Sequence, residues 1–169
     1  MSNQDMNDAT GRPVDAANDK LKETDSEEYV TAVLDGQLFG IPVLSVQDVL
    51  GPQDLANIPL APPEVAGSLN LRGRIVTAID LRKRLGMEPA DREKSMSIVV
   101  DHHGELYSLL IDEVGEVLRV PLQNYERNPP TLDPRWRDVS QGIFRLDGRL
   151  LVILQVQRLL DIIKVAAAA

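Results

Sequence analysis

Residues Tyr29–Val43 have the sequence YVTAVLDGQLFGIPV, two runs of β-forming residues separated by a turn signal. The first run ends at Leu34, the second begins at Gln37, and Asp35-Gly36 stands between them. Asp-Gly favours the tight two-residue turn of a β-hairpin, because both residues of that turn need positive φ. The sequence therefore predicts a β-hairpin at the beginning of the folded part of the chain.

This hairpin has a second copy later in the chain. When the sequence is aligned with itself, Gly36-Gln37-Leu38-Phe39 falls on Gly104-Glu105-Leu106-Tyr107. The same alignment, without a gap, places Val46, Val49 and Leu50 on Val114, Val117 and Leu118. A slightly longer offset gives further matches, with Gly67, Leu71, Gly73, Arg74 and Leu85 falling on Gly142, Leu146, Gly148, Arg149 and Leu160. Each half of the chain thus has a hairpin, a short segment, a proline-containing connector and a second hairpin.

The repeat predicts two similar β-units, about residues 29–86 and 97–161, related by an approximate two-fold axis. Each unit alone is small for a stable core, so we expect the two to share one. The alternative is that two unrelated β-meanders align because both use glycine turns and Val/Leu strands. The Gly-Arg pair that recurs at the same place in both turns favours the repeat.

Several predicted strands are apolar at nearly every position, which is typical of strands covered on both faces. These runs are Ile75–Ile79, Ser97–Val100, Leu106–Ile111, Gly142–Leu146 and Leu150–Val156. Helical signals are few: a short helix is expected over Asp80–Leu85, ended by Gly86, and a C-terminal helix over Gln157–Ala168. The proline-rich stretches 58–63 and 128–134 cannot lie in central strands and are expected to be connections.

The charge of the chain is concentrated at its N-terminus. The whole chain has a net charge of −8, and the segment from Met1 to Glu28 carries eight acidic and three basic side chains. Residues 1–27 are therefore expected to form a disordered acidic tail, because their sparse apolar residues cannot offset the entropy cost of ordering. No apolar run approaches the roughly 20 residues of a membrane span, and the start of the chain is too polar for a signal peptide, so we expect a cytoplasmic protein.

The residues that usually carry catalysis are scarce. The chain has no Cys and only two His, the adjacent His102 and His103. Neighbouring residues on a strand point to opposite faces, so we interpret this pair as a solvated hairpin tip and predict no metal site. Phosphate-binding loops, nucleophile elbows and zinc-protease motifs are all missing from the sequence. We therefore expect no catalytic residues and no cofactor.

Two features indicate binding rather than chemistry. Five basic residues lie close together, and for two of them, Lys83 and Arg84, a solvated basic face is the favoured interpretation. Arg72 differs, because it lies between Leu71 and Gly73 at the predicted tip of a tight turn, where a rigidly held guanidinium can contact an acidic partner.

The second feature is a set of apolar residues that follow each hairpin. Most of them are expected in the core, but the seam between two units can leave a groove for an amphipathic helix.

The motif GSLNLRGRIV at residues 67–76, followed by Ile79-Asp80-Leu81-Arg82, resembles the signature of the CheW family of bacterial chemotaxis coupling proteins. The segments 39–43, 46–49, 112–117, 142–143 and 150–160 also resemble that family, in the same order. The resemblance covers residues 28–163, which we expect to form one CheW-like domain, and leaves 164–169 as a short C-terminal tail.

This resemblance implies an all-β fold of two intertwined five-stranded SH3-like barrels. It also implies a non-catalytic adaptor that couples transmembrane chemoreceptors (methyl-accepting chemotaxis proteins) to the chemotaxis histidine kinase. The partners would be the helical cytoplasmic tip of the receptor and the regulatory domain of the kinase, in arrays beneath the inner membrane. The implied coupling residues are Gly67, Asn70, Arg72 and Gly73, and the implied receptor-groove residues are Val43, Val46 and Asp48.

Two alternatives stay open at this point. A CheW-like adaptor of a chemosensory pathway without flagellar output would have the same fold and the same turn. A small-barrel nucleic-acid-binding protein is disfavoured, because the acidic net charge and the six scattered aromatic residues supply neither a phosphate track nor a stacking surface.

Overall fold

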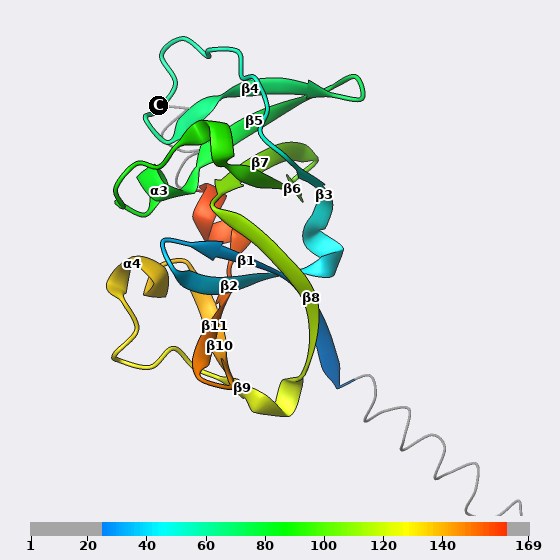
Figure 1. Ribbon diagram of the computed structural model, residues 1–169. Coiled ribbons are helices and arrows are strands. Elements are labelled where there is room, and N and C mark those ends of the chain that lie inside the picture. Colours follow the sequence, from blue (N-terminus) through cyan, green and yellow to red (C-terminus); the bar gives the residue numbers. More distant parts are fainter. Residues whose placement is uncertain (1–24, 162–169) are drawn as a thin grey trace, which may run out of the picture.

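The computed structural model describes residues 25–161, which form two β-sheets and a few short helices (Figure 1). The strands are β1 (Ser26–Leu34), β2 (Gln37–Pro42), β3 (Val46–Leu50), β4 (Val65–Leu71), β5 (Arg74–Asp80), β6 (Met96–His102), β7 (Glu105–Ile111), β8 (Glu113–Pro121), β9 (Tyr125–Glu126), β10 (Ser140–Leu146) and β11 (Arg149–Leu154). The short helices are α3 (Leu81–Arg84), α4 (Pro134–Arg137) and the 3-10 turns η1 (Val43–Ser45), η2 (Arg92–Lys94) and η3 (Leu122–Asn124). A further helix begins at residue 156 and continues to residue 161.

The two halves of the chain exchange hairpins between the sheets. One sheet has the order β8-β1-β2-β11-β10-β9, and the other has the order β3-β6-β7-β5-β4. The first hairpin, β1–β2, thus lies among strands of the second half, while the second-half hairpin β6–β7 lies among strands of the first half (Figure 1). The expected all-β fold of two intertwined units is confirmed.

The strand registers confirm the internal repeat. β3 pairs with β6 so that Val46 faces Val100, and β8 pairs with β1 so that Val114 faces Ala32. The self-alignment that places Val46 on Val114 also places Ala32 on Val100, so the two pairs are equivalent. The parallel pairs agree as well, since Thr77 faces Tyr107 in one sheet and Val152 faces Phe39 in the other. A chance alignment of two meanders would not reproduce these registers, so that alternative is wrong.

Each sheet curls so that its own two outer strands approach each other. In the larger sheet, β8 leads through the three residues of η3 directly into β9, which pairs with β10 at the opposite edge. In the smaller sheet, the chain after β3 makes a single bridge to β4 through Ala56 and Ser68. The two-residue strand β9 gives the larger sheet six strands, whereas five were expected for each unit.

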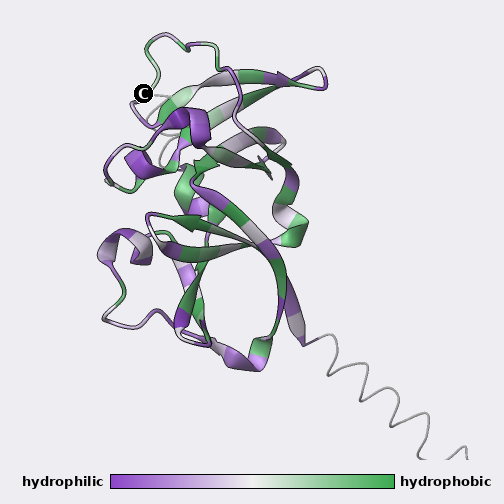
Figure 2. Cartoon of the chain, viewed as in Figure 1, coloured by the Kyte–Doolittle hydropathy of each residue, from purple (hydrophilic) through white to green (hydrophobic). Residues whose placement is uncertain are grey.

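Three groups of buried residues explain why the strands are apolar on both faces. Leu151 and Ile153 of β11 belong to a small core within the six-stranded sheet, and Val76 and Val99 belong to its counterpart within the five-stranded sheet. Val152, the residue between the first pair, faces the largest cluster, which contains side chains from both sheets. In Figure 2, hydrophobic residues, coloured green, are spread along the strands of both sheets. The shared core that the sequence predicted is confirmed.

The two expected helices are present where the structure describes them. Asp80 caps α3, because its side chain accepts a hydrogen bond from the N–H of Lys83, and the helix ends before Gly86. The helix at 156–161 lies between the two sheets (Figure 1) and buries Leu159 and Leu160 in the shared core. Within residues 25–161, no helix has the length and apolar character that a membrane crossing requires.

The ordered strands begin slightly earlier than the sequence indicated. Ser26 and Glu27, placed in the acidic tail by composition, pair with Pro121 and Val120 of β8. Acidic residues are tolerated there because β1 projects beyond the core at this end, and Glu27 is only half-buried. The carbonyl oxygen of Asp25 accepts a hydrogen bond from the N–H of Leu122 at 2.9 Å, and residues 1–24 and 162–169 lie outside the described part of the chain.

A charged group joins the two sheets at one corner. Arg82 of α3 donates two hydrogen bonds to the carboxylate of Asp112, from Nε at 3.0 Å and from Nη2 at 2.7 Å. The backbone N–H of Asp35, in the β1–β2 turn, donates to the same carboxylate at 2.8 Å. Burial alone would raise the pKa of Asp112, but these hydrogen bonds and the Arg82 charge outweigh it and lower that pKa.

We expect Arg82→Ala to lower the free energy of unfolding at neutral pH by about 1.5–3 kcal/mol, the usual cost of losing hydrogen bonds to a charged group. Since the pKa of Asp112 is lower in the folded state than in the unfolded state, where it is near 3.8, the stabilisation is complete above that value. The stabilisation disappears as the pH falls through the pKa of Asp112 in the folded state. The free energies of unfolding of the variant and the parent should therefore converge in acid. Urea unfolding over a range of pH measures this difference.

The matched control is Lys83→Ala, because Lys83 is the next residue of α3, is exposed and makes none of these contacts with Asp112. A loss in this control equal to that of Arg82→Ala would assign the effect to the removal of a positive charge from α3, and not to the contact with Asp112. A difference between Arg82→Ala and the parent that is constant down to the acid transition would contradict the role of Asp112.

Candidate protein-interaction surface

The β4–β5 turn presents Arg72 at its tip. The side-chain oxygen of Asn70 accepts a hydrogen bond from the N–H of Gly73 at 2.9 Å, which closes the turn. Arg72 and Gly73 have φ of 52° and 85°, the left-handed pair of a two-residue hairpin turn. Asn70 and Gly73 therefore build the turn, and Arg72 projects from it with its side chain 75% exposed. The sequence correctly placed Arg72 at a rigid tip.

An arginine is an unusual residue for this backbone conformation. Two other tight hairpin turns have Asp35 and His103 at the equivalent position with positive φ, and Asp and His adopt positive φ more readily than most residues. A left-handed residue other than glycine costs about 1–2 kcal/mol. The protein thus holds Arg72 at a position where its backbone is strained, which makes Arg72 a candidate for a functional role.

Arg72 is oriented by an acidic residue from another strand. Its Nη2 lies 2.8 Å from Oδ2 of Asp48 in β3, whose side chain is only 23% exposed. The other oxygen of Asp48 accepts the N–H of Val49 at 2.8 Å, which fixes the carboxylate. The contact is an ion pair without hydrogen-bond geometry, since Oδ2 of Asp48 has no hydrogen-bond partner among residues 25–161. The donors of Arg72 therefore stay available on the solvent side.

This ion pair also brings together two predicted surfaces. The sequence assigned Arg72 to one set of site residues and Asp48 to another. β3 and β4 are the outer strands of the five-stranded sheet, so the residues meet only because that sheet curls. The separation in sequence conceals this contact. A basic and an acidic residue on opposite edges of a predicted barrel are the signal from which it could have been found.

Gly67 of β4 allows two backbone segments, β4 and the chain after β3, to approach each other closely. Ala56 and Ser68 exchange two hydrogen bonds, each 2.8 Å long, next to it. A Cβ at position 67 would lie 2.6 Å from the carbonyl oxygen of Ala56 and 2.9 Å from Cβ of Leu55. Its φ of 151° is also unfavourable for other residues. Gly67 is therefore a structural residue of the site and offers no side chain to a partner.

The predicted apolar groove residues are less accessible than expected. Val43 and Val46 are half-buried and pack against the shared core. The exposed apolar side chains of this segment are Leu44 of η1, with 92% of its surface exposed, and Val49 of β3, with 38%. Val49 was among the apolar residues that the sequence placed after the first hairpin, whereas Leu44 was missed, because alternation along a strand does not extend through the 3-10 turn.

The basic cluster near α3 is mostly engaged within the protein. Arg84, interpreted as part of a solvated face, is half-buried, and its Nε donates to the carbonyl oxygen of Leu159 at 3.1 Å. That interpretation is wrong for Arg84, because the C-terminal helix supplies an acceptor that the local sequence does not reveal. Lys83 is exposed, as expected.

The interpretation of the two histidines as a solvated hairpin tip is also wrong in part. His102, at the end of β6, is only 7% exposed, and its Nε2 lies 2.9 Å from Oδ1 of Asp161. The hydrogen bond to His102 keeps the pKa of Asp161 below its ordinary value. The two imidazole rings lie side by side, with centroids 4.1 Å apart, because His103 has φ of 54° and strand alternation does not apply to it.

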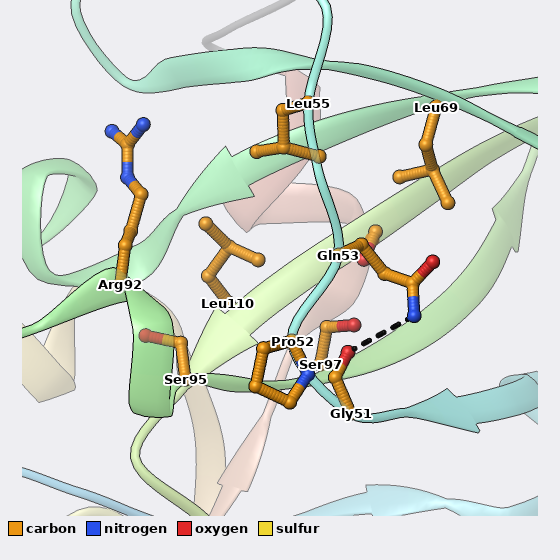
Figure 3. Close-up of a pocket in the computed structure, with 10 residues that line it drawn as sticks. Gly51, Pro52, Gln53, Leu55, Leu69, Arg92, Ser95, Ser97 and Leu110 are labelled. Carbon is orange, nitrogen blue, oxygen red and sulfur yellow. Dashed lines mark hydrogen bonds between the residues drawn. The ribbon is translucent and has the colours of Figure 1, made fainter.

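A small pocket lies beneath the segment that follows β3 (Figure 3). Pro52 and Leu55 line it together with Ser97 and Ser108. Its volume of about 20 Å³ has room for roughly one water molecule. Oγ of Ser108, which is buried and lacks a hydrogen-bond partner within the described part of the chain, is a group that such a water could satisfy. This pocket is too small for a metabolite.

Comparison with known proteins gives consistent matches. Residues 28–164 match the CheW-like domain family. The chemotaxis protein CheW of Helicobacter pylori is 27% identical over 163 residues, covering 95% of this chain and 98% of its own length. The chemotaxis protein CheW of Thermotoga maritima is 29% identical over 148 residues, covering 87% and 94%. The crystal structure of the scaffolding protein TtCheW from Thermoanaerobacter tengcongensis aligns with a TM-score of 0.68 and 30% identity, covering 76% of this chain and 88% of that one.

Proposed function

This chain belongs to the CheW-like domain family, and from that premise we propose how its surface takes part in coupling. The protein is a chemotaxis coupling adaptor that acts between receptors and a kinase. We assign the contact with the helical cytoplasmic tip of a chemoreceptor to the region around η1 and β3. The regulatory domain of the histidine kinase is the second partner, and the protein performs no reaction itself.

The observation that carries this proposal is the pairing of Arg72 with Asp48 beside exposed apolar residues. Leu44 and Val49 offer apolar surface, and the guanidinium of Arg72, paired with Asp48 on the strand of Val49, offers hydrogen-bond donors. An amphipathic helix with an acidic residue beside its apolar face matches both features. A surface of this kind binds through a few well-placed side chains, and it needs no pocket.

The same proposal gives the place of action. A receptor tip and a kinase domain meet in the cytoplasm beneath the inner membrane, so the adaptor works there, held by its partners. The two repeat units present different surfaces at equivalent positions. Val49 and its repeat mate Val117 are both exposed, at 38% and 53%, and Asp48 aligns with Glu116, but Arg72 aligns with the acidic Asp147. Unlike surfaces on one chain allow head-to-tail assembly into closed rings.

We expect Leu44→Asp to reduce recruitment of the full chain to receptor membranes by about tenfold or more, since an apolar contact is replaced by a charge that must be desolvated. Co-sedimentation with chemoreceptor-containing membranes and the chemotaxis kinase of the same organism measures this recruitment. Leu44 is preferable to Val46 for the test, because Val46 packs against the shared core and its replacement would also affect stability.

The control is Leu60→Asp. Leu60 is fully exposed on the connector between β3 and β4, and its positive φ of 62° suits Asp. Equal recruitment of Leu44→Asp and the parent chain would refute the receptor surface proposed for η1. Equal loss in both variants would show that net charge, and not the apolar contact, controls recruitment.

A further inference from the structure

A cluster of metal-binding side chains lies at the junction between the β6–β7 turn and the C-terminal helix. It consists of His102, His103 and Asp161, and its ligand atoms all lie within 4.8 Å of one another. We propose that these three side chains bind one divalent transition-metal ion, with zinc as the best match. The adaptor function described above does not require this site, so the two proposals succeed or fail independently.

The local backbone explains how adjacent histidines come to share one side of the molecule. His102 is the last residue of β6, and His103 is the first residue of the turn. In a continuous strand their side chains would point to opposite faces. The left-handed conformation of His103, with φ of 54°, turns its ring back toward His102, so the centroids are 4.1 Å apart. The turn therefore creates a pair of imidazoles that a regular strand could not.

The third ligand comes from a distant part of the chain. Asp161 lies on the C-terminal helix, and its Oδ1 is 2.9 Å from Nε2 of His102. That nitrogen is therefore aimed at the carboxylate. A metal ion would replace the proton that joins these two atoms, with His102 neutral and protonated on Nδ1. His102 is 7% exposed and is held in place by its surroundings, so it forms the fixed part of the site.

Two of the ligands can adjust to a metal. Zinc binds imidazole nitrogen at about 2.0–2.1 Å and carboxylate oxygen at about 2.0–2.2 Å, which requires ligand atoms roughly 3.3 Å apart in a tetrahedron. His103 is exposed and the side chain of Asp161 is 46% exposed. Rotation of these two side chains can therefore bring the three ligand atoms, now up to 4.8 Å apart, to the distances that zinc requires, without a shift of the sheet. Two imidazoles and one carboxylate leave a fourth position for water.

The donor set selects the class of metal. Imidazole nitrogen favours zinc, nickel and copper, whereas magnesium and calcium prefer sites built only from oxygen. Binding would fasten the helix at 156–161 to the β6–β7 turn of the five-stranded sheet. Arg84 already donates a hydrogen bond to the carbonyl oxygen of Leu159 in this helix, and the metal would add a second connection at Asp161.

The composition of the chain makes the test unusually clean. The whole protein has two histidines and no cysteine, so a zinc signal from imidazole or thiolate ligands can come only from this site. The experiment uses the full chain without a histidine tag, titrated with zinc chloride in a calorimeter. Histidine ring nitrogens are observed in parallel by NMR. We expect one zinc ion per chain, shifts of both imidazoles, and a melting temperature that rises with zinc concentration. Magnesium chloride should produce none of these effects.

The decisive variant is His103→Asn. Asparagine tolerates the left-handed conformation, and residue 103 is exposed, so the turn should be preserved. We expect zinc affinity to fall by about tenfold or more, at least as much as is lost when a supporting residue of a metal site is removed. Asp161→Asn, which retains a side-chain oxygen near His102 but loses the charge, should weaken binding similarly.

The proposal is overturned by an absence of stoichiometric zinc binding, or by an affinity unchanged in His103→Asn. The second result would exclude His103 as a ligand and with it the three-ligand site. An affinity unchanged in Asp161→Asn would exclude the three-ligand site and its link to the C-terminal helix. A melting temperature of His103→Asn equal to that of the parent chain, measured without zinc, is the control for folding.

Discussion

Gly67→Ala is expected to destabilise the protein by about 2–3 kcal/mol, because the substitution combines a steric clash with an unfavourable backbone conformation. The added methyl group would lie 2.6 Å from the carbonyl oxygen of Ala56, which belongs to the backbone and cannot rotate away. Relief requires the chain after β3 to separate from β4, which breaks the two hydrogen bonds between Ala56 and Ser68. The measured quantity is the free energy of unfolding in urea.

The same displacement should reach the interaction surface. Asp48 lies on β3 and Arg72 lies at the end of β4, so separation of these edges lengthens their ion pair. Gly51→Ala is the matched control, because that glycine has no atom within 4 Å of an added Cβ and no positive φ. If Gly67→Ala and Gly51→Ala unfold at the same urea concentration, the close approach at Gly67 does not contribute to stability.

Arg72→Asn is expected to separate coupling from folding. Asparagine adopts positive φ more easily than arginine, so the turn should be as stable as in the parent chain or slightly more stable. Loss of the guanidinium removes a charge-assisted contact of about 1.5–3 kcal/mol, which corresponds to a roughly ten- to hundredfold weaker interaction. Pull-down of the kinase–receptor complex and a kinase activation assay measure the loss, while thermal unfolding measures stability.

Two further variants define what Arg72 contributes. Arg72→Lys retains the charge but not the planar fork, so partial activity would assign the effect to directed hydrogen bonds. Asp48→Asn removes the carboxylate that orients Arg72 and should weaken coupling less than Arg72→Asn does. Full coupling by a folded Arg72→Asn variant would exclude the turn from the partner surface.

The strands and the repeat could be predicted from sequence because their signals are local. Turn pairs such as Asp35-Gly36 fix where a hairpin reverses, and the alignment of the chain with itself then transfers one half onto the other. The observed pairing of Val46 with Val100, and of Val114 with Ala32, obeys that alignment. The exchange of hairpins carries no local signal and was implied only by the family resemblance.

The contacts that sequence analysis missed are those made across long separations or in unusual backbone conformations. Arg82 looked like one of several surface cations, because its partner Asp112 lies 30 residues away. Arg84 finds its acceptor on the C-terminal helix, 75 residues away. His102 and His103 were placed on opposite faces because the alternation rule applies to a continuous strand. His103 has a left-handed backbone conformation, so the rule does not apply to it.

The exchange of hairpins has a consequence for the synthesis of the protein on the ribosome. β2 ends at Pro42, but its parallel neighbour β11 begins only at Arg149, so most of the chain is translated between them. At about 5–20 residues per second, the first hairpin waits roughly 5–20 s for the strand that completes its sheet. During that interval Phe39 and Ile41, which are fully buried in the finished protein, remain open to chaperones and to other nascent chains.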